Sequence, residues 1–193
     1  KNGNTSGSVD CVAGSGAEND IISIQTDITL TTPSGNEGVG PFGVYGPRGV
    51  TINGNDHTIK RDLNSTQFGI FFFAGPSDIV INNLTIEDGS IVDDSGQGLG
   101  AGIYASTIKS LTLNNVNFNN NNAINGGAVY LSTDSSPNTT LTINNSSFTN
   151  NSAKQSGGAL YIKNTSNTLN TIIYNSVFDT NSSDGNGGAV FAD

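Results

Sequence analysis

A repeat of about 30 residues constrains the fold of this chain more than any other feature of its sequence. The tetrapeptide Phe-x-x-Asn occurs three times, beginning at Phe118, Phe148 and Phe178. The tripeptide Gly-Gly-Ala follows each copy, beginning at Gly126, Gly157 and Gly187. Because two separate motifs keep the same period, each repeat is expected to be one structural unit that stacks on the next.

Apolar and polar residues alternate within each repeat, as in Leu111-x-Leu113, Val116-x-Phe118 and Val129-x-Leu131. This period of two is typical of half-buried strands, and helical periodicity is absent. Strands this short are not stable alone, but stacked repeats pair each strand with its equivalents above and below. The sequence therefore predicts an all-β parallel β-helix, a three-sheet solenoid of about six coils.

The composition agrees with such a solenoid, although taken alone it would also suit a disordered chain. Hydrophobic residues make up 34% of the 193 positions and charged residues 12%, and there are 28 asparagines. A β-helix coil needs few inward side chains, and its polar turns face water. Order is thus inferred from the pattern and not from total hydrophobicity.

Several repeated residues receive structural roles in this prediction. Phe118, Phe148 and Phe178 are expected to form a stack in the core. One asparagine in each of four coils is expected at the bend between two strands, where it adopts left-handed backbone angles and its amide bonds to the next coil. These bend asparagines are Asn83, Asn115, Asn145 and Asn175. The asparagines that end Phe-x-x-Asn are expected to bond to backbone and close the following turn; they are Asn121, Asn151 and Asn181.

One set of aromatic residues is predicted to face outward, because its neighbours in the alternating pattern point into the core. The set contains Tyr45, Phe71, Tyr104, Tyr130, Tyr161 and Phe191. Stacked rings on an outer face could stiffen a solvent-facing sheet, or they could form a contact surface for a receptor, a sugar or a neighbouring chain. The sequence alone leaves both interpretations open.

The chain is expected to divide into an N-terminal cap with the first coil, residues 1–40, and β-helix coils, residues 41–193. The single cysteine, Cys11, is expected to be a small buried residue of the cap or a thiol that pairs with another chain. The sequence stops at Asp193, just after a Gly-Gly-Ala-Val-Phe segment, so further repeats are expected beyond it.

Charge and hydropathy argue against two classes of partner. The net charge of -9 disfavours nucleic acid, and the longest apolar run, residues 70–74, is too short for insertion of this segment into a membrane. The most acidic segment, residues 87–99, holds Asp88, Asp93 and Asp94. We interpret it as a solvated loop, with calcium binding as the alternative, although its spacing matches no defined calcium loop.

The paired Phe-x-x-Asn and Gly-Gly-Ala-[Val/Leu/Ile] motifs resemble the repeats of chlamydial polymorphic outer membrane proteins and related autotransporter passengers. Three copies of each motif cover residues 118–190, and degenerate copies reach back to about residue 42. The resemblance implies a right-handed, pectin-lyase-like β-helix displayed at the bacterial surface or secreted. It also implies an adhesin that binds a host-cell protein or glycan receptor, with self-association in some cases.

Enzymes share this architecture, so a polysaccharide lyase or hydrolase is the alternative, and a self-assembling filament or matrix subunit is a third hypothesis. The best local cluster of ionisable residues is Asp56, His57, Lys60, Arg61 and Asp62. Glycoside hydrolysis needs two carboxylates that flank one bond, and lyase chemistry needs a carboxylate-bound calcium with an Arg or Lys on the same face. In this sequence no acidic pair lies next to Arg or Lys one period away. We therefore expect no catalytic residues, no cofactor and no enzymatic activity.

Overall fold

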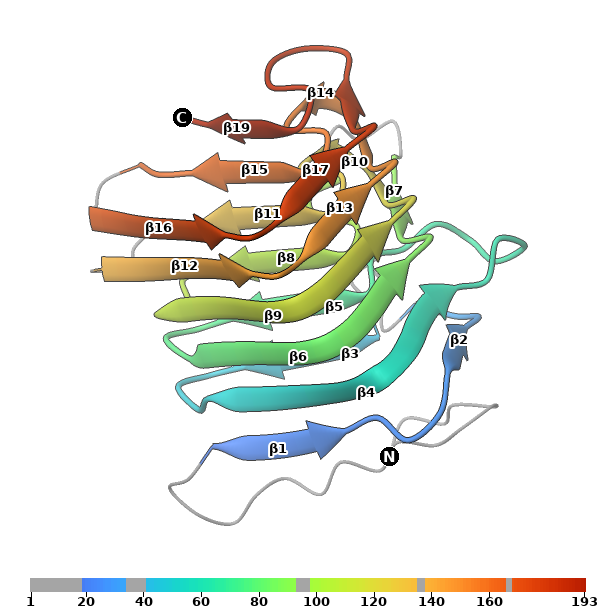
Figure 1. Cartoon of the computed structure of the whole chain (residues 1–193), viewed down its shortest axis with the longest axis vertical. Helices are drawn as coiled ribbons and strands as arrows, with labels where there is room; N and C mark the ends of the chain where they lie inside the picture. The colour runs from blue at the N-terminus through green and yellow to red at the C-terminus, as the bar shows by residue number, and fades with distance from the viewer. Residues whose placement is uncertain (1–18, 34–40, 93–97, 135–137, 166–167) are drawn as a thin grey trace.

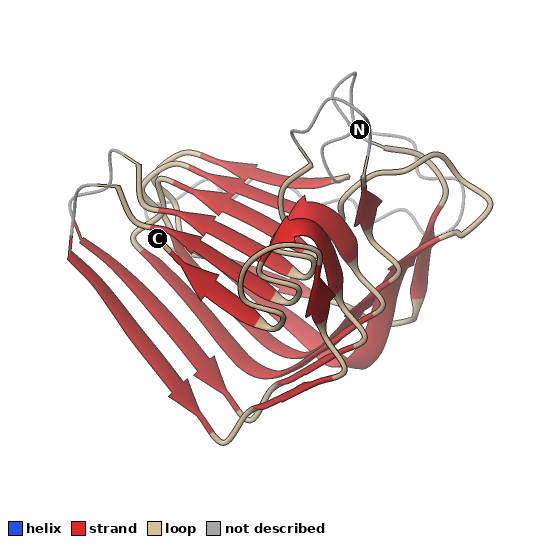
Figure 2. Ribbon diagram, turned by 90° about the horizontal axis from the view of Figure 1, so that it is seen from above, coloured by secondary structure: helices blue, strands red, loops and turns tan. Residues whose placement is uncertain are grey.

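The computed structural model describes residues 19–33, 41–92, 98–134, 138–165 and 168–193. Over these residues the secondary structure is entirely β, with short parallel strands that wind into a solenoid. In Figure 1 the chain runs left to right on the near side and right to left on the far side while it rises from N to C, so the winding is right-handed. Viewed along the solenoid axis, the strands of successive coils lie over one another around a narrow interior (Figure 2).

The first sheet has one long strand or strand pair from each coil. Its order is β1 (Asp20–Ser23), β4 (Val50–Arg61), β6 (Asp78–Glu87), β9 (Ser110–Asn119), β12 (Asn138–Asn144) and β16 (Thr168–Tyr174). Shorter strands extend its far end: β2 (Ile28–Leu30), β13 (Ser147–Thr149) and β17 (Val177–Asp179). β4, β6 and β9 continue through the bend that separates β12 from β13, so this sheet covers two faces of the solenoid.

The other two sheets complete each coil. The second sheet contains β7 (Ser90–Ile91), β10 (Asn122–Asn125), β14 (Ser152–Ser156) and β18 (Ser182–Ser183). The third contains β3 (Phe42–Tyr45), β5 (Phe71–Ala74), β8 (Ile103–Ser106), β11 (Val129–Ser132), β15 (Leu160–Lys163) and β19 (Val190–Ala192). The predicted parallel three-sheet solenoid is therefore confirmed, and the third sheet contributes six strands.

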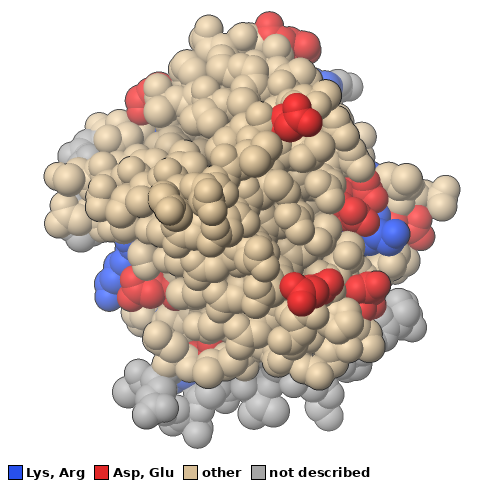
Figure 3. Space-filling model, viewed as in Figure 1, with Lys and Arg blue, Asp and Glu red and all other residues tan. Residues whose placement is uncertain are grey.

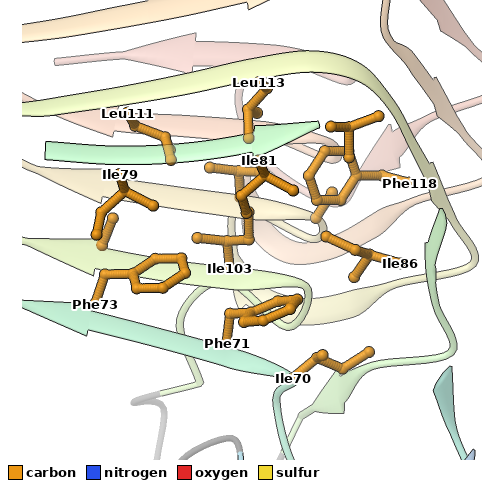
Figure 4. Close-up of a cluster of buried hydrophobic side chains, with 14 of the residues drawn as sticks. Ile70, Phe71, Phe73, Ile79, Ile81, Ile86, Ile103, Leu111, Leu113 and Phe118 are labelled. Carbon is orange, nitrogen blue, oxygen red and sulfur yellow. The ribbon is translucent and has the colours of Figure 1, made fainter. Parts of the chain in front are cut away.

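In-register pairing places equivalent side chains above one another in the core. Ile81, Leu113 and Ile143 form one such series, and all three are fully buried. Phe118, Phe148 and Phe178 form an inner phenylalanine stack, with ring centroids 4.7 and 4.5 Å apart and interplanar angles of 10° and 3°. Figure 4 shows Phe118 among the aliphatic side chains of neighbouring coils. The predicted core stack is present.

The Gly-Gly pairs let the chain re-enter a strand where two coils approach closely. Gly157 has a φ of +66°, a left-handed conformation that side chains rarely adopt. At Gly158 a Cβ atom would lie 2.1 Å from the carbonyl oxygen of Gly188 in the next coil. Any larger residue at either position would therefore strain the turn or push the coils apart.

The predicted cap is described only in part. β1 and β2 both pair with β4, so residues 20–30 form the first-sheet part of a coil next to it. Residues 1–18, which include Cys11, and residues 34–40 lie outside the described residues. Within the described ranges, no helix is long and apolar enough to cross a membrane.

Candidate binding surface

A continuous series of aromatic rings lies on the outer face of the third sheet. Register pairing aligns Phe72, Tyr104, Tyr130, Tyr161 and Phe191. In β5, β8, β11 and β15 the flanking residues, such as Val129 and Leu131, are buried, so the aromatic side chains point away from the core. We call these five residues and Tyr45 the outer aromatic stack.

The prediction that Phe71 belongs to this outer set was wrong. Phe71 is only 2% exposed, and its ring contacts Phe42 and Phe73 at centroid distances of 5.2 and 5.7 Å. Figure 4 shows both Phe71 and Phe73 pointing into the core. Phe72 occupies the outer position instead, because Phe71 pairs with Ile103 and not with Tyr104.

Tyr45 joins the outer aromatic stack from a different register position. The strand residue paired with Phe72 is Gly43, which has no side chain, and the Tyr45 ring lies over it. The ring centroids of Tyr45 and Phe72 are 5.3 Å apart. The glycine thus leaves space that a tyrosine two residues later fills.

The stacking geometry determines which parts of these rings a partner can reach. Successive centroids from Phe72 through Tyr104 and Tyr130 to Tyr161 are 5.0, 5.6 and 5.1 Å apart, with interplanar angles of 18°, 7° and 13°. The π faces of the inner members are therefore covered by one another. Tyr130 is 6% exposed, whereas Tyr45 is 69% exposed. Solvent therefore reaches the stack at its less buried members, which include Tyr45, Tyr104 and Tyr161.

Burial and neighbouring groups alter the acidity of two phenols in this stack. Desolvation raises the pKa of Tyr130, and the adjacent Tyr161 and Tyr104 add to the shift. Desolvation also raises the pKa of Tyr161 to about 12, helped by its hydroxyl, which donates a 2.8 Å hydrogen bond to Asp193 Oδ2. Both phenols are therefore protonated at neutral pH.

The bend asparagines lie where the sequence placed them. Asn83, Asn115, Asn145 and Asn175 have φ angles of 51°, 58°, 51° and 53°. Asn115 Nδ2 donates to Asn83 Oδ1 at 2.8 Å, and Asn175 Nδ2 donates to Asn145 Oδ1 at the same distance. These amides are exposed and connect adjacent coils.

A second asparagine ladder was missed by the sequence reasoning. It contains Asn53, Asn82, Asn114 and Asn144, and we call it the outer asparagine ladder. Each Nδ2 donates to Oδ1 of the preceding member, at 2.9 to 3.0 Å. The Asn-Asn pairs at 82–83, 114–115 and 144–145 were the available signal, because the residue before a bend asparagine recurs in the same way.

The asparagines of Phe-x-x-Asn bond to backbone of the neighbouring coil as well as to one another. Asn151 Oδ1 accepts from the backbone N–H and the side-chain amide of Asn121, both at 3.0 Å. Asn151 Nδ2 donates to Phe118 O and to Asn181 Oδ1, each at 3.0 Å. Asn121 and Asn151 are completely buried. These three residues, the buried asparagine stack, hold each turn against the preceding one.

The cluster around His57 has structural partners. His57 Nδ1 lies 3.2 Å from Asp27 Oδ1. The same carboxylate accepts from the backbone N–H of Thr58, which is the main reason why the pKa of Asp27 is lowered. Arg61 is buried, and its guanidinium donates to the carbonyl oxygens of Asp88, Asp62 and Ser65. Arg61 thus connects the segment after β4, which holds Asp62 and Ser65, to Asp88 in the next coil.

The predicted calcium alternative cannot be placed as a whole. Asp88 has a φ of 61° and its carbonyl accepts from Arg61, while Asp93 and Asp94 lie outside the described residues. In the part of the chain that the structure describes, no three His, Cys, Asp or Glu side chains are grouped to hold a metal ion. The face in Figure 3 shows acidic side chains scattered rather than gathered.

Comparison with known families identifies the repeat. The Chlamydia polymorphic membrane protein repeat matches residues 145–163 and residues 175–193. Each matched segment begins at a bend asparagine and contains one Phe-x-x-Asn and one Gly-Gly-Ala motif, ending in or just after the third-sheet strand. No curated protein and no solved structure matches the chain. The resemblance indicated by the two motifs is confirmed, and the chain carries two copies of the Chlamydia polymorphic membrane protein repeat within a β-solenoid.

Proposed function

We propose that this chain is part of an autotransporter passenger, displayed at the bacterial surface or secreted, and that it acts as an adhesin for a host-cell receptor. The observation that carries the proposal is the match to a polymorphic membrane protein repeat. The two matched segments include Tyr161 and Phe191, so two members of the outer aromatic stack lie within the matched repeats. A solenoid of this kind offers a partner its exterior.

The geometry of the outer aromatic stack favours a protein receptor over a glycan. Sugars bind aromatic residues mainly by lying on a ring face, and the faces of Tyr104 and Tyr130 are covered by their neighbours. Tyrosine edges and hydroxyls are suited to a protein surface, where they combine apolar contact with hydrogen bonding. We therefore assign the stack to contact with a protein, through its exposed edges.

Binding of the purified chain to cultured host cells tests this proposal. The triple variant Tyr104→Phe, Tyr130→Phe, Tyr161→Phe keeps all the rings but removes three hydroxyls. If these groups contact the receptor, the apparent Kd should rise about tenfold or more, since each lost hydrogen bond costs ~1 kcal/mol. The matched control is Tyr174→Phe, because Tyr174 lies in the first sheet and is 67% exposed.

Three outcomes separate the parts of the proposal. Binding by neither the wild-type chain nor the variants would reject the adhesin role. Equal binding by the wild-type chain and the triple variant, with unchanged circular dichroism, would reject the outer aromatic stack as the contact surface. Protease treatment of the cells should abolish binding, whereas loss after periodate treatment alone would assign the receptor to glycans.

The proposal assigns no catalysis to the chain. Arg61, the buried cation of the predicted cluster, donates to three backbone carbonyls and is not placed to act as a base. Incubation with polygalacturonate, with and without calcium, tests this assignment. Release of unsaturated or reducing oligosaccharides would reassign the chain to the polysaccharide-cleaving enzymes.

A further inference from the structure

We propose that neighbouring tyrosines of the outer aromatic stack, above all Tyr130 and Tyr161, are a site of oxidative cross-linking, at which a peroxidase-type oxidant joins the two rings as dityrosine. This modification is independent of the proposed adhesin role. It would place a covalent bond between two successive coils.

The register of the third sheet brings these two rings together. Tyr130 and Tyr161 are paired residues of β11 and β15, and their ring centroids lie 5.1 Å apart with an interplanar angle of 13°. Tyr104 and Tyr130 form a second pair, at 5.6 Å and 7°. Parallel pairing fixes the two backbones, so radicals formed on the Tyr130 and Tyr161 rings remain next to one another. The other tyrosine beside Tyr130, Tyr104, is slightly farther away.

Tyr161 is the ring from which oxidation begins. Its side chain is partly exposed, and its hydroxyl donates a 2.8 Å hydrogen bond to Asp193 Oδ2. Loss of an electron makes a phenol strongly acidic, so a carboxylate at this distance accepts the proton as the electron leaves. Tyr130 is buried between two rings, and it is oxidised by electron transfer to an oxidised neighbour.

The reaction balances with hydrogen peroxide as the terminal oxidant. Each phenol loses one electron and its phenolic proton, and the two radicals form a carbon–carbon bond between ring positions ortho to the oxygens. The two ring hydrogens at the new bond then move to the oxygens and restore both phenols. Overall, two tyrosines and one hydrogen peroxide give one dityrosine and two water molecules.

The chain is well suited to a direct test. Treatment of the purified protein with peroxidase and limiting hydrogen peroxide should produce dityrosine fluorescence. Trypsin then separates all five tyrosines, because cleavage after Arg48, Arg61, Lys109, Lys154 and Lys163 leaves each on a different peptide. The expected product is a joined pair of residues 110–154 and 155–163, lighter than the sum of its parts by two hydrogen atoms.

Matched variants distinguish this site from random coupling. Tyr130→Phe keeps the stacked ring but should abolish this product, and Tyr174→Phe should leave its yield unchanged. Tyr45 and Tyr174 are the most exposed tyrosines, at 69% and 67%. Products dominated by these two residues, or a yield that falls on dilution as intermolecular coupling requires, would overturn the proposal. Absence of any dityrosine in the wild-type chain would overturn it as well.

Discussion

Two stacks of aromatic rings run through this molecule, one inside the core and one on its surface. The inner phenylalanine stack has centroid distances of 4.7 and 4.5 Å, and the outer aromatic stack has distances of 5.0 to 5.6 Å. Both follow from parallel strands paired in register about 4.8 Å apart. Ring stacking is therefore a consequence of the fold and is not by itself a sign of recognition.

What separates the two stacks is the environment of the rings. Phe118 and Phe148 are fully buried, and in earlier coils the same position is held by Ile86 and Ile59. Any large apolar residue thus serves inside, where burial provides the stabilisation. On the outer face of the third sheet, five successive strands hold Tyr or Phe at the aligned position, although these side chains do not point into the core. The outer stack is for this reason the better candidate for a functional surface.

The largest difference between the stacks should appear in stability. Phe148→Ala removes a fully buried ring and leaves a cavity, so the free energy of unfolding should fall by ~3–5 kcal/mol. Tyr104→Ala should cost less, about 1–3 kcal/mol, because Tyr104 is only partly buried and mainly loses two ring contacts on an outer face. Chemical denaturation of both variants measures this difference. Equal costs would show that the outer stack is as much a part of the core as the inner one.

The buried asparagine stack and the outer asparagine ladder provide a second comparison, because Asn121 and Asn151 are fully buried whereas the members of the outer ladder are only partly buried. Asn151→Ala should lower the free energy of unfolding by about 2–4 kcal/mol, since it removes the acceptor of the buried Asn121 backbone N–H and the side-chain donor to the Phe118 carbonyl. Asn144→Ala in the outer asparagine ladder should cost ~1 kcal/mol or less, because water can replace its bond to Asn114.

Denaturation of both asparagine variants under the same conditions makes this test. The ladder bonds have nearly the same length in both groups, 3.0 Å, so a difference in cost would come from burial. If Asn144→Ala were the more damaging change, the partly buried amides of the outer asparagine ladder would stabilise the solenoid more than the buried asparagine stack does.

The sequence predicted the features that depend on the period and missed those that depend on local register. Stacked repeats required parallel sheets, a core series through Phe118, and asparagines at the bends. The position of Phe71 was predicted wrongly because residues 71–73 are three successive phenylalanines. Such a run has no alternation of apolar and polar residues that would show which side chains face the core. The contribution of Tyr45 depends on the gap above Gly43, which is visible only once β3 and β5 are paired.

The structural role of Arg61 and the outer asparagine ladder were not predicted, because both depend on contacts between coils. The guanidinium of Arg61 bonds to carbonyls that are distant in sequence, such as Asp88 O, and no local pattern encodes those contacts. Asn82 and Asn114 each precede a bend asparagine, so the sequence held a signal for their ladder, but the bond between their amides follows from the register of the coils. Repeat sequences thus reveal their architecture readily, while the contacts that distinguish one coil from another need coordinates.

The smallest predicted effect concerns the outer stack at high pH. Tyr161 has a pKa of about 12 in the folded chain against an ordinary value near 10, so the folded state holds its proton more tightly than the unfolded state. Its contribution to stability is therefore complete below about pH 10 and is lost as the pH rises toward 12. The melting temperature should fall across this interval, and Tyr161→Phe should make the decline shallower. Tyr174→Phe, outside the stack, is the matched control for removal of one phenol. If the melting temperature of Tyr161→Phe fell as steeply with pH as that of the wild-type chain, the loss of stability would belong to other groups.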